Sequence, residues 1–155
     1  MSPPGVPRRP TLLRSTGGLL ALSLADIDPA NRGGASEVIS NRRILRVLDT
    51  GAFELVSATV TGLRALTTYE FVVVVSNSQF DSPPSAVFAA TTTRVTPPSA
   101  PLNVALSHRT GGMLALTWEA PVDLGGVALS AYIVYVYKTS QGQVRTAGLS
   151  PGTCM

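Results

Sequence analysis

The sequence predicts an all-β Greek-key sandwich that occurs in two tandem copies. Three observations predict it: apolar residues alternate with period two, turn-forming clusters recur about every 8–12 residues, and one stretch is written twice. Pro3–Leu24 aligns without a gap with Pro97–Trp118, a shift of 94 positions with 10 of 22 residues identical. A repeat of this kind indicates two copies of one small domain. We expect copy one at residues 1–96 and copy two at residues 97–155.

In copy one, rows of alternating apolar residues mark the strands. Leu20, Leu22 and Leu24 share one face, and a later row shares another: Tyr69, Phe71, Val73 and Val75. Clusters such as Thr16-Gly17-Gly18 separate the rows. We therefore expect six strands, in chain order Thr11–Leu13, Leu19–Leu24, Ile39–Val47, Glu54–Val60, Thr68–Asn77 and Val87–Thr92.

Copy two begins after a linker at Thr93–Pro98, whose two prolines favour an extended and fairly stiff joint. Its rows are Leu114, Leu116 and Trp118, and then Tyr132, Val134 and Val136. Gly125-Gly126 marks a turn between them.

The order of these features resembles a tandem of fibronectin type III domains, with an immunoglobulin-like sandwich in each copy. Pro7 and Pro101 resemble the proline-led first strand, and Trp118 resembles the core tryptophan. Leu63 and Tyr69 stand six apart, as in the family's tyrosine corner, where a buried hydroxyl bonds to upstream backbone. The resemblance implies a structural core that includes Leu22, Leu63, Tyr69, Phe71, Trp118 and Tyr132.

Two departures from the family pattern stand out. Copy one has Leu24 where copy two has Trp118. Copy two ends in "GLSPGTCM", which resembles "GLRALTTY" with Met155 at the position of Tyr69. We therefore expect copy two to lack its last two strands, to leave the edge of a strand at Ala131–Lys138 unpaired, and to fold only marginally alone.

Composition excludes several classes of protein. Only 14% of residues are charged, the net charge is +3, and there is one cysteine and one histidine, so no intrachain disulfide, histidine-pair metal site or hydrolytic triad is expected. Asp26-x-Asp28 lacks the later ligands of a calcium loop. The start has no signal-peptide pattern, no apolar run approaches a membrane span, and we expect no cofactor.

Three arginines form the densest basic group: Arg42, Arg43 and Arg46. One interpretation is a patch for an anionic polysaccharide or nucleic acid. The other is a solvated strand with one arginine lying along the edge of the core. No aromatic residue is interleaved for base stacking, which argues against nucleic acid.

Two apolar features are candidates for contact with another protein or a neighbouring domain. Phe80 lies in a loop that often carries recognition in the resembling family, and it either anchors a partner or folds back over the sandwich end. The outward rows of two strands are also apolar, which indicates either a contact surface or ordinary β-propensity: Val72 and Val74 in copy one, and Ile133, Tyr135 and Tyr137 in copy two.

No constellation of reactive groups is present, so the sequence predicts a non-catalytic module. It favours a structural and protein-interaction module inside a larger adhesion, receptor or scaffold protein, with an extracellular or cell-surface parent. The alternative is a spacer in a carbohydrate-active or other multidomain enzyme whose catalytic domain lies elsewhere in the polypeptide.

Overall fold

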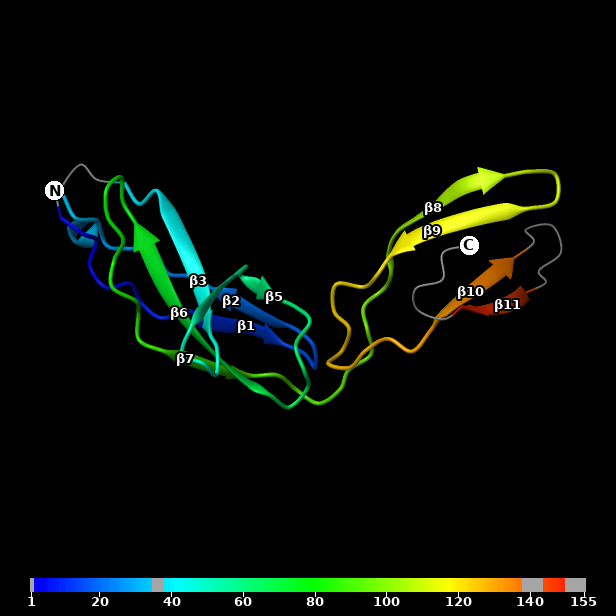
Figure 1. Ribbon diagram of the computed structural model, residues 1–155, viewed down its shortest axis with the longest axis horizontal. Helices are drawn as coiled ribbons and strands as arrows, with labels where there is room; N and C mark the ends of the chain where they lie inside the picture. The colour runs from blue at the N-terminus through cyan, green and yellow to red at the C-terminus, as the bar shows by residue number, and fades with distance from the viewer. Residues whose placement is uncertain (1, 35–37, 138–143, 150–155) are drawn as a thin grey trace.

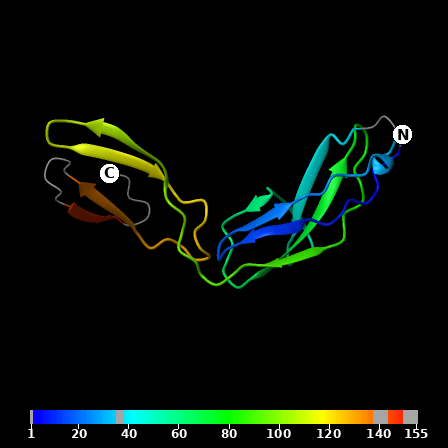
Figure 2. The ribbon, with the colours of Figure 1, turned by 180° about the vertical axis from the view of Figure 1, so that it is seen from behind.

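The computed structural model describes residues 2–34, 38–137 and 144–149, without the side chains of the last range. The molecule is elongated, with copy one at one end and copy two at the other (Figure 1). The same two-part outline is seen from behind (Figure 2). Apart from one turn of 3-10 helix, η1 (Pro29–Asn31), every element of the described chain is a strand.

Copy one consists of two antiparallel sheets that pack as a sandwich. The smaller sheet has the strand order β1-β2-β5 and the larger has the order β4-β3-β6-β7. The bounds of the strands are β1 Thr11–Ser15, β2 Leu20–Ser23, β3 Asn41–Val47, β4 Phe53–Val56, β5 Thr59–Val60, β6 Thr68–Ser76 and β7 Phe88–Thr91. One three-stranded and one four-stranded sheet, with connections that cross between them, make the immunoglobulin-like Greek-key sandwich that the sequence predicts.

The single strand expected at Glu54–Val60 is wrong, because the chain forms two strands there that belong to different sheets. β4 pairs with β3, whereas β5 pairs with β2. The chain changes sheets at Ser57-Ala58, where the Ala58 carbonyl accepts the N–H of Leu22 at 2.7 Å. Alternation alone does not show this change, because both strands continue the same period-two pattern.

The core of copy one lies between its sheets. The buried cluster draws on both of them: Leu20, Leu22, Ile44, Val60, Leu63, Phe71 and Ala90. A second small cluster of Ile27, Val73 and Val75 extends the core toward the N-terminal end. Tyr69 packs half-buried against the main cluster, and its hydroxyl accepts the backbone N–H of Arg64 at 3.0 Å.

Copy two consists of two separate hairpins. β8 (Leu102–Arg109) pairs with β9 (Leu114–Glu119), and β10 (Tyr132–Tyr137) pairs with β11 (Val144–Leu149). The expected edge at Ala131–Lys138 is therefore paired on one side, by β11. Within the described residues its other side has no partner strand, whereas the matching strand β3 of copy one is paired on both sides.

The described side chains of β8, β9 and β10 are mostly exposed. Every residue of β8 is exposed, and the hairpins meet where the half-buried rings of Trp118 and Tyr132 lie 5.5 Å apart. The stretch of copy two that aligns with Tyr69 falls mostly on residues 150–155, outside the described residues. The core residues expected in copy one thus lie inside a closed sandwich, while those of copy two lie between two open hairpins.

We expect the Tyr69→Phe variant to lose roughly 1–3 kcal/mol of unfolding free energy, because the Arg64 N–H loses its partner while the ring stays. Leu22→Ala should lose roughly 2–5 kcal/mol by leaving a cavity in the buried cluster. Tyr135→Phe, at an exposed position, is the matched control and should unfold like the wild type. Urea unfolding, followed by far-UV circular dichroism, measures the unfolding free energy of all three variants. Equal midpoints for Tyr69→Phe and the control would contradict a structural role for the hydroxyl.

Candidate functional site: the joint between the two copies

The β1–β2 turn of copy one, Thr16-Gly17-Gly18, forms one half of a joint between the copies. The Thr16 N–H donates to the Leu19 carbonyl at 2.9 Å and closes the turn. The Thr16 hydroxyl accepts the N–H of Gly18 at 3.3 Å, so its oxygen is held in place while its own hydrogen can point outward. The turn therefore presents one hydroxyl donor, which is followed in the chain by two residues without side chains.

The other half of the joint is the loop Asp123-Leu124-Gly125-Gly126, which follows β9. Asp123 Oδ1 accepts the N–H of Gly125 at 2.8 Å. The Asp123 carbonyl accepts the N–H of Ser99 at 2.9 Å, and the Asp123 N–H donates to the Ser99 hydroxyl at 3.2 Å. These bonds fix the carboxylate with Oδ1 satisfied inside the loop and Oδ2 facing copy one.

The two halves meet in a buried hydrogen bond. The Thr16 hydroxyl donates to Asp123 Oδ2 at 2.6 Å, across 107 positions of sequence, and both residues are only 8% exposed. A carboxylate removed from water needs such a partner, and a bond to an ionised acceptor is stronger than one between neutral groups. The contact at the joint is thus a specific polar contact.

Backbone bonds surround this contact. The Ala65 N–H of copy one donates to the Gly126 carbonyl at 3.3 Å, and the Gly17 N–H donates to the Thr96 hydroxyl of the linker at 3.3 Å. The Thr96 N–H donates to the Gly125 carbonyl at 3.0 Å. Linker, turn and loop are therefore bonded to one another, and they lie together between the copies in Figure 1.

Glycine is required at the joint because the two backbones approach closely. A Cβ on Gly17 would lie 2.1 Å from the Gly125 carbonyl oxygen, and a Cβ on Gly18 would lie 2.7 Å from the Gly126 nitrogen. Gly125 and Gly126 also adopt positive φ values of 76° and 93°, which L side chains rarely adopt. A Cβ on Gly17, Gly18 or Gly126 would overlap atoms across the joint, and a Cβ on Gly125 would overlap Thr96 of the linker, so a larger residue at any of these positions must displace the backbone that it meets.

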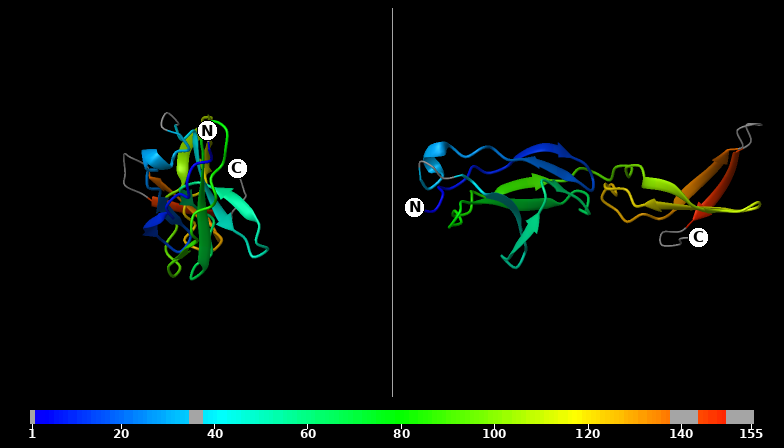
Figure 3. Two further views of the ribbon diagram at one scale, coloured as in Figure 1. Left: turned by 90° about the vertical axis from the view of Figure 1, so that its left-hand side faces the viewer. Right: turned by 90° about the horizontal axis from the view of Figure 1, so that it is seen from above.

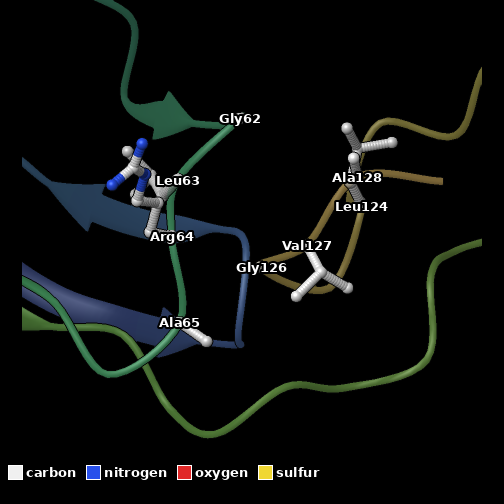
Figure 4. A pocket seen from close by; sticks show the side chains of 8 residues that line it. All are labelled: Gly62, Leu63, Arg64, Ala65, Leu124, Gly126, Val127 and Ala128. Carbon is white, nitrogen blue, oxygen red and sulfur yellow. The ribbon is translucent and has the colours of Figure 1, made fainter.

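A shallow cleft of about 520 Å³ opens beside the joint (Figure 4). It lies between Gly62–Ala65 of copy one and Leu124–Ala128 of copy two, and its lining is mainly apolar. Arg64 is the one ionisable side chain in that lining. The cleft thus offers no pair of groups for acid–base catalysis.

The three arginines of β3, for which the sequence left an anion patch and a solvated strand open, are not free side chains in the structure. Each of the three arginines is paired with its own carboxylate: Arg42 with Asp26 at 2.6 Å, Arg43 with Asp81 at 2.6 Å, and Arg46 with Glu54 at 2.5 Å. The guanidinium of Arg46 also lies 5.7 Å from the centre of the Tyr69 ring. Each positive charge is thus balanced locally, and Arg46 lies over a ring that packs against the core. This arrangement favours the solvated-strand interpretation over the anion patch.

The prediction that Val72 and Val74 offer an exposed apolar row is also wrong. They are 3% and 7% exposed. Arg43 stands opposite Val74 in the sheet and reaches Ser76 at 3.3 Å and Asp81, which carries its aliphatic stem past Val74. The middle of β6, Phe71–Val75, is therefore covered on both faces.

The other candidate contact residues are exposed. Phe80 is 44% exposed on a fixed loop, since its N–H donates to the Asn77 side chain at 2.9 Å and its carbonyl accepts the Asn77 N–H at 3.0 Å. Ile133, Tyr135 and Tyr137 are each more than half exposed on one face of β10. These four side chains are free to contact a partner.

Sequence reasoning missed the joint itself. Thr16-Gly17-Gly18 and Gly125-Gly126 are visible in the sequence only as turn clusters. One signal could have indicated the joint: the sequence Thr-Gly-Gly is identical in both copies. A turn by itself does not require a threonine and two glycines, so this identity points to a further role. Among the described residues, no group of three or more His, Cys, Asp or Glu side chains could hold a metal ion. No helix in that part of the chain has the length and apolar character needed to cross a bilayer.

No family model matches the chain. Among curated proteins it is similar to exoglucanase B of Cellulomonas fimi, with 35% identity over 129 residues. The match covers 79% of this chain but 12% of the exoglucanase, so the chain spans about an eighth of that protein's length.

The chain is also similar to solved fibronectin type III structures, each at 18% identity. The sixth fibronectin type III domain of a human fibronectin type III domain containing protein 3 gives a TM-score of 0.47 and covers 64% of this chain and 95% of its own. The FN1-FN3 domains of chicken CNTN1 give 0.45, covering 96% and 52%. A two-domain fibronectin type III segment of chicken tenascin gives 0.38, covering 96% and 79%. These three structures include both single and tandem fibronectin type III domains.

Gly17→Ala should separate the motions of the two copies, because its Cβ would lie 2.1 Å from a backbone oxygen of copy two. Gly111→Ala, at the matching position of copy two, is the control, since a Cβ there meets nothing within 4 Å in the described part of the chain. ¹⁵N relaxation measures the rotational correlation time of each copy. We expect one shared value in the wild type and in Gly111→Ala, and two separate values in Gly17→Ala. A shared value in Gly17→Ala would show that the joint tolerates the side chain.

The loop that carries Phe80 should loosen in acid. The pKa of Asp81 is lowered below its ordinary value of 3.8. The largest cause is the Ser76 hydroxyl, which donates to the carboxylate at 2.6 Å, and the second is the hydrogen bond from Arg43. These bonds therefore stabilise the loop above pH 3.8, and the stabilisation is lost as the pH falls through the lower folded-state pKa.

Carbon-detected NMR of the Asp81 carboxyl group, with the Phe80 amide as a reporter, measures this titration. Asp81→Asn should abolish the acid transition at Phe80. An Asp81 midpoint at or above 3.8 would contradict the prediction.

Proposed function

We propose that the chain is a pair of fibronectin type III modules, at residues 1–96 and 97–155, that acts as a non-catalytic spacer and holds its neighbours in a fixed relative orientation. The observation that carries this proposal is the buried bond from Thr16 to Asp123 at 2.6 Å, because a flexible tether needs no buried polar contact between its domains. The surrounding backbone bonds and the proline-containing linker support the same role.

The similarity to a segment of an exoglucanase favours a spacer in a multidomain carbohydrate-active enzyme over an adhesion or receptor protein. In this proposal the chemistry belongs to another part of the polypeptide, and the parent is extracellular or at the cell surface. The flanking sequence of the parent gene separates the two: a catalytic domain beside this segment supports the enzyme spacer, and a long run of further repeats with a membrane span supports adhesion.

A protein-contact role is the second candidate, and the exposed Phe80 favours it. An apolar ring on a loop that its own hydrogen bonds hold in shape loses little entropy on binding. The exposed face of β10, with Ile133, Tyr135 and Tyr137, would then serve a partner protein or a neighbouring domain.

Distances between the copies test the spacer role. Spin labels at Leu55 of β4 and Val104 of β8, both exposed, report the separation of the copies after Cys154→Ser removes the native thiol. We expect one narrow distance distribution in double electron–electron resonance, and a broad one after Thr16→Val with Asp123→Ala. The full chain should also release no sugar from soluble β-glucan. A broad distribution in the wild type, or sustained hydrolysis, would overturn the proposal.

A further inference from the structure

Copy two contains a second turn with the same sequence as the copy-one half of the joint, Thr110-Gly111-Gly112. Its Thr110 N–H donates to the Met113 carbonyl at 2.8 Å, and its Thr110 hydroxyl accepts the N–H of Gly112 at 3.4 Å. The corresponding bonds in the joint measure 2.9 and 3.3 Å. The turn therefore presents a hydroxyl in the same internal setting as that of Thr16.

Nothing in the described part of the chain covers this second turn. All three of its residues are exposed, and a Cβ on Gly111 or Gly112 would meet no atom within 4 Å. In the joint, the same positions contact backbone of copy two at distances that exclude a side chain. The second turn thus has the same internal hydrogen bonds as the turn in the joint, but no described segment packs against it.

The loop half of the joint also occurs twice. In copy one the loop Asn31-Arg32-Gly33-Gly34 begins at the last residue of η1. Its Gly33 carbonyl accepts the N–H of Ser2 at 3.0 Å, and its Asn31 carbonyl accepts the N–H of Gly5 at 2.8 Å. In the joint loop the corresponding donors are Thr96 and Ser99, 94 positions after Ser2 and Gly5. Their N–H groups donate to the Gly125 carbonyl at 3.0 Å and to the Asp123 carbonyl at 2.9 Å. Gly33 has a φ of 91°, in the same positive region as Gly125.

Asn31 occupies the place that Asp123 occupies in the joint, and it is exposed. Its side-chain oxygen can accept a hydroxyl hydrogen as a carboxylate does, although without the charge. The Asn77 amide donates to the Arg32 carbonyl at 3.1 Å and holds this loop against copy one, while Asn31 itself stays exposed. The loop and the second turn lie at opposite ends of the molecule: η1 and its loop lie beside the N-terminus, and the β8–β9 turn lies at the far end (Figure 3). A chain with complementary halves at opposite ends can associate head to tail.

We propose that the Thr110-Gly111-Gly112 turn is a docking site for the Asn31–Gly34 loop of a second copy of this chain, so that the contact between copy one and copy two is repeated between molecules. The inference rests on the proposed spacer role, which it deepens by naming a partner. The Thr110 hydroxyl donates to Asn31, and Gly111 and Gly112 permit the close approach of the two backbones.

NMR titration of a ¹⁵N-labelled full chain with unlabelled full chain, up to about 1 mM, tests the contact. We expect the amide signals of Thr110, Gly111 and Gly112 to shift in a saturable manner. Asn31→Asp in the unlabelled chain should tighten binding by about threefold to tenfold, because a charged acceptor strengthens the bond. Asn31→Ala in that chain, or Gly111→Val in the labelled chain, should abolish the shifts, and Asn41→Ala on the exposed start of β3 is the matched control that should not.

The absence of shifts at residues 110–112 with both the wild-type and the Asn31→Asp chains would overturn the proposal. So would shifts confined to residues 132–137, which would show association through the open edge of β10 instead. The spacer role is read separately, from the distance between labels on Leu55 and Val104 within one chain, so either idea can fail without the other.

Discussion

The relative placement of the two copies depends on one buried carboxylate. Asp123 has one oxygen bonded inside its own loop, to the Gly125 N–H, and the other bonded to the Thr16 hydroxyl of copy one. A buried carboxylate with an unpaired oxygen costs free energy, so the loop is fully satisfied only when copy one is in place. This bond acts together with the bond from the Ala65 N–H to the Gly126 carbonyl and with the bonds of Thr96. Several bonds at different points of the joint restrain rotation between the copies, which a stiff linker alone would allow.

Four glycines allow that bond to form. Gly17 and Gly18 bring the turn into backbone contact with the loop, and Gly125 and Gly126 give the loop its left-handed path. The same turn sequence in copy two lies in open space within the described chain. Identical residues thus form a tight joint in one place and an exposed turn in another, and only the neighbouring segment differs.

The two copies differ in how fully their strands are partnered. In copy one, β3 is paired on both edges and the middle of β6 is buried on both faces, so the inner rows form a buried core between the sheets. In copy two, β10 is paired on one edge within the described residues, and the rings of Trp118 and Tyr132 make a contact between the hairpins. Among the side chains of copy two whose burial is described, the buried positions, including Asp123, lie in or next to the loop of the joint.

The sequence alone determined the fold class and the two-copy organisation, because period-two alternation and a repeat shifted by 94 positions are local patterns that survive in one dimension. The resemblance of the Leu63–Tyr69 stretch to the tyrosine corner of fibronectin type III domains also implied the hydroxyl role of Tyr69, whose bond to the Arg64 N–H the structure shows. Only the tertiary structure decided which charges neutralise Arg42, Arg43 and Arg46, and that Val72 and Val74 are covered. The joint likewise needed the folded chain, because Thr16 and Asp123 are 107 residues apart and no periodicity records a contact between turns of different domains.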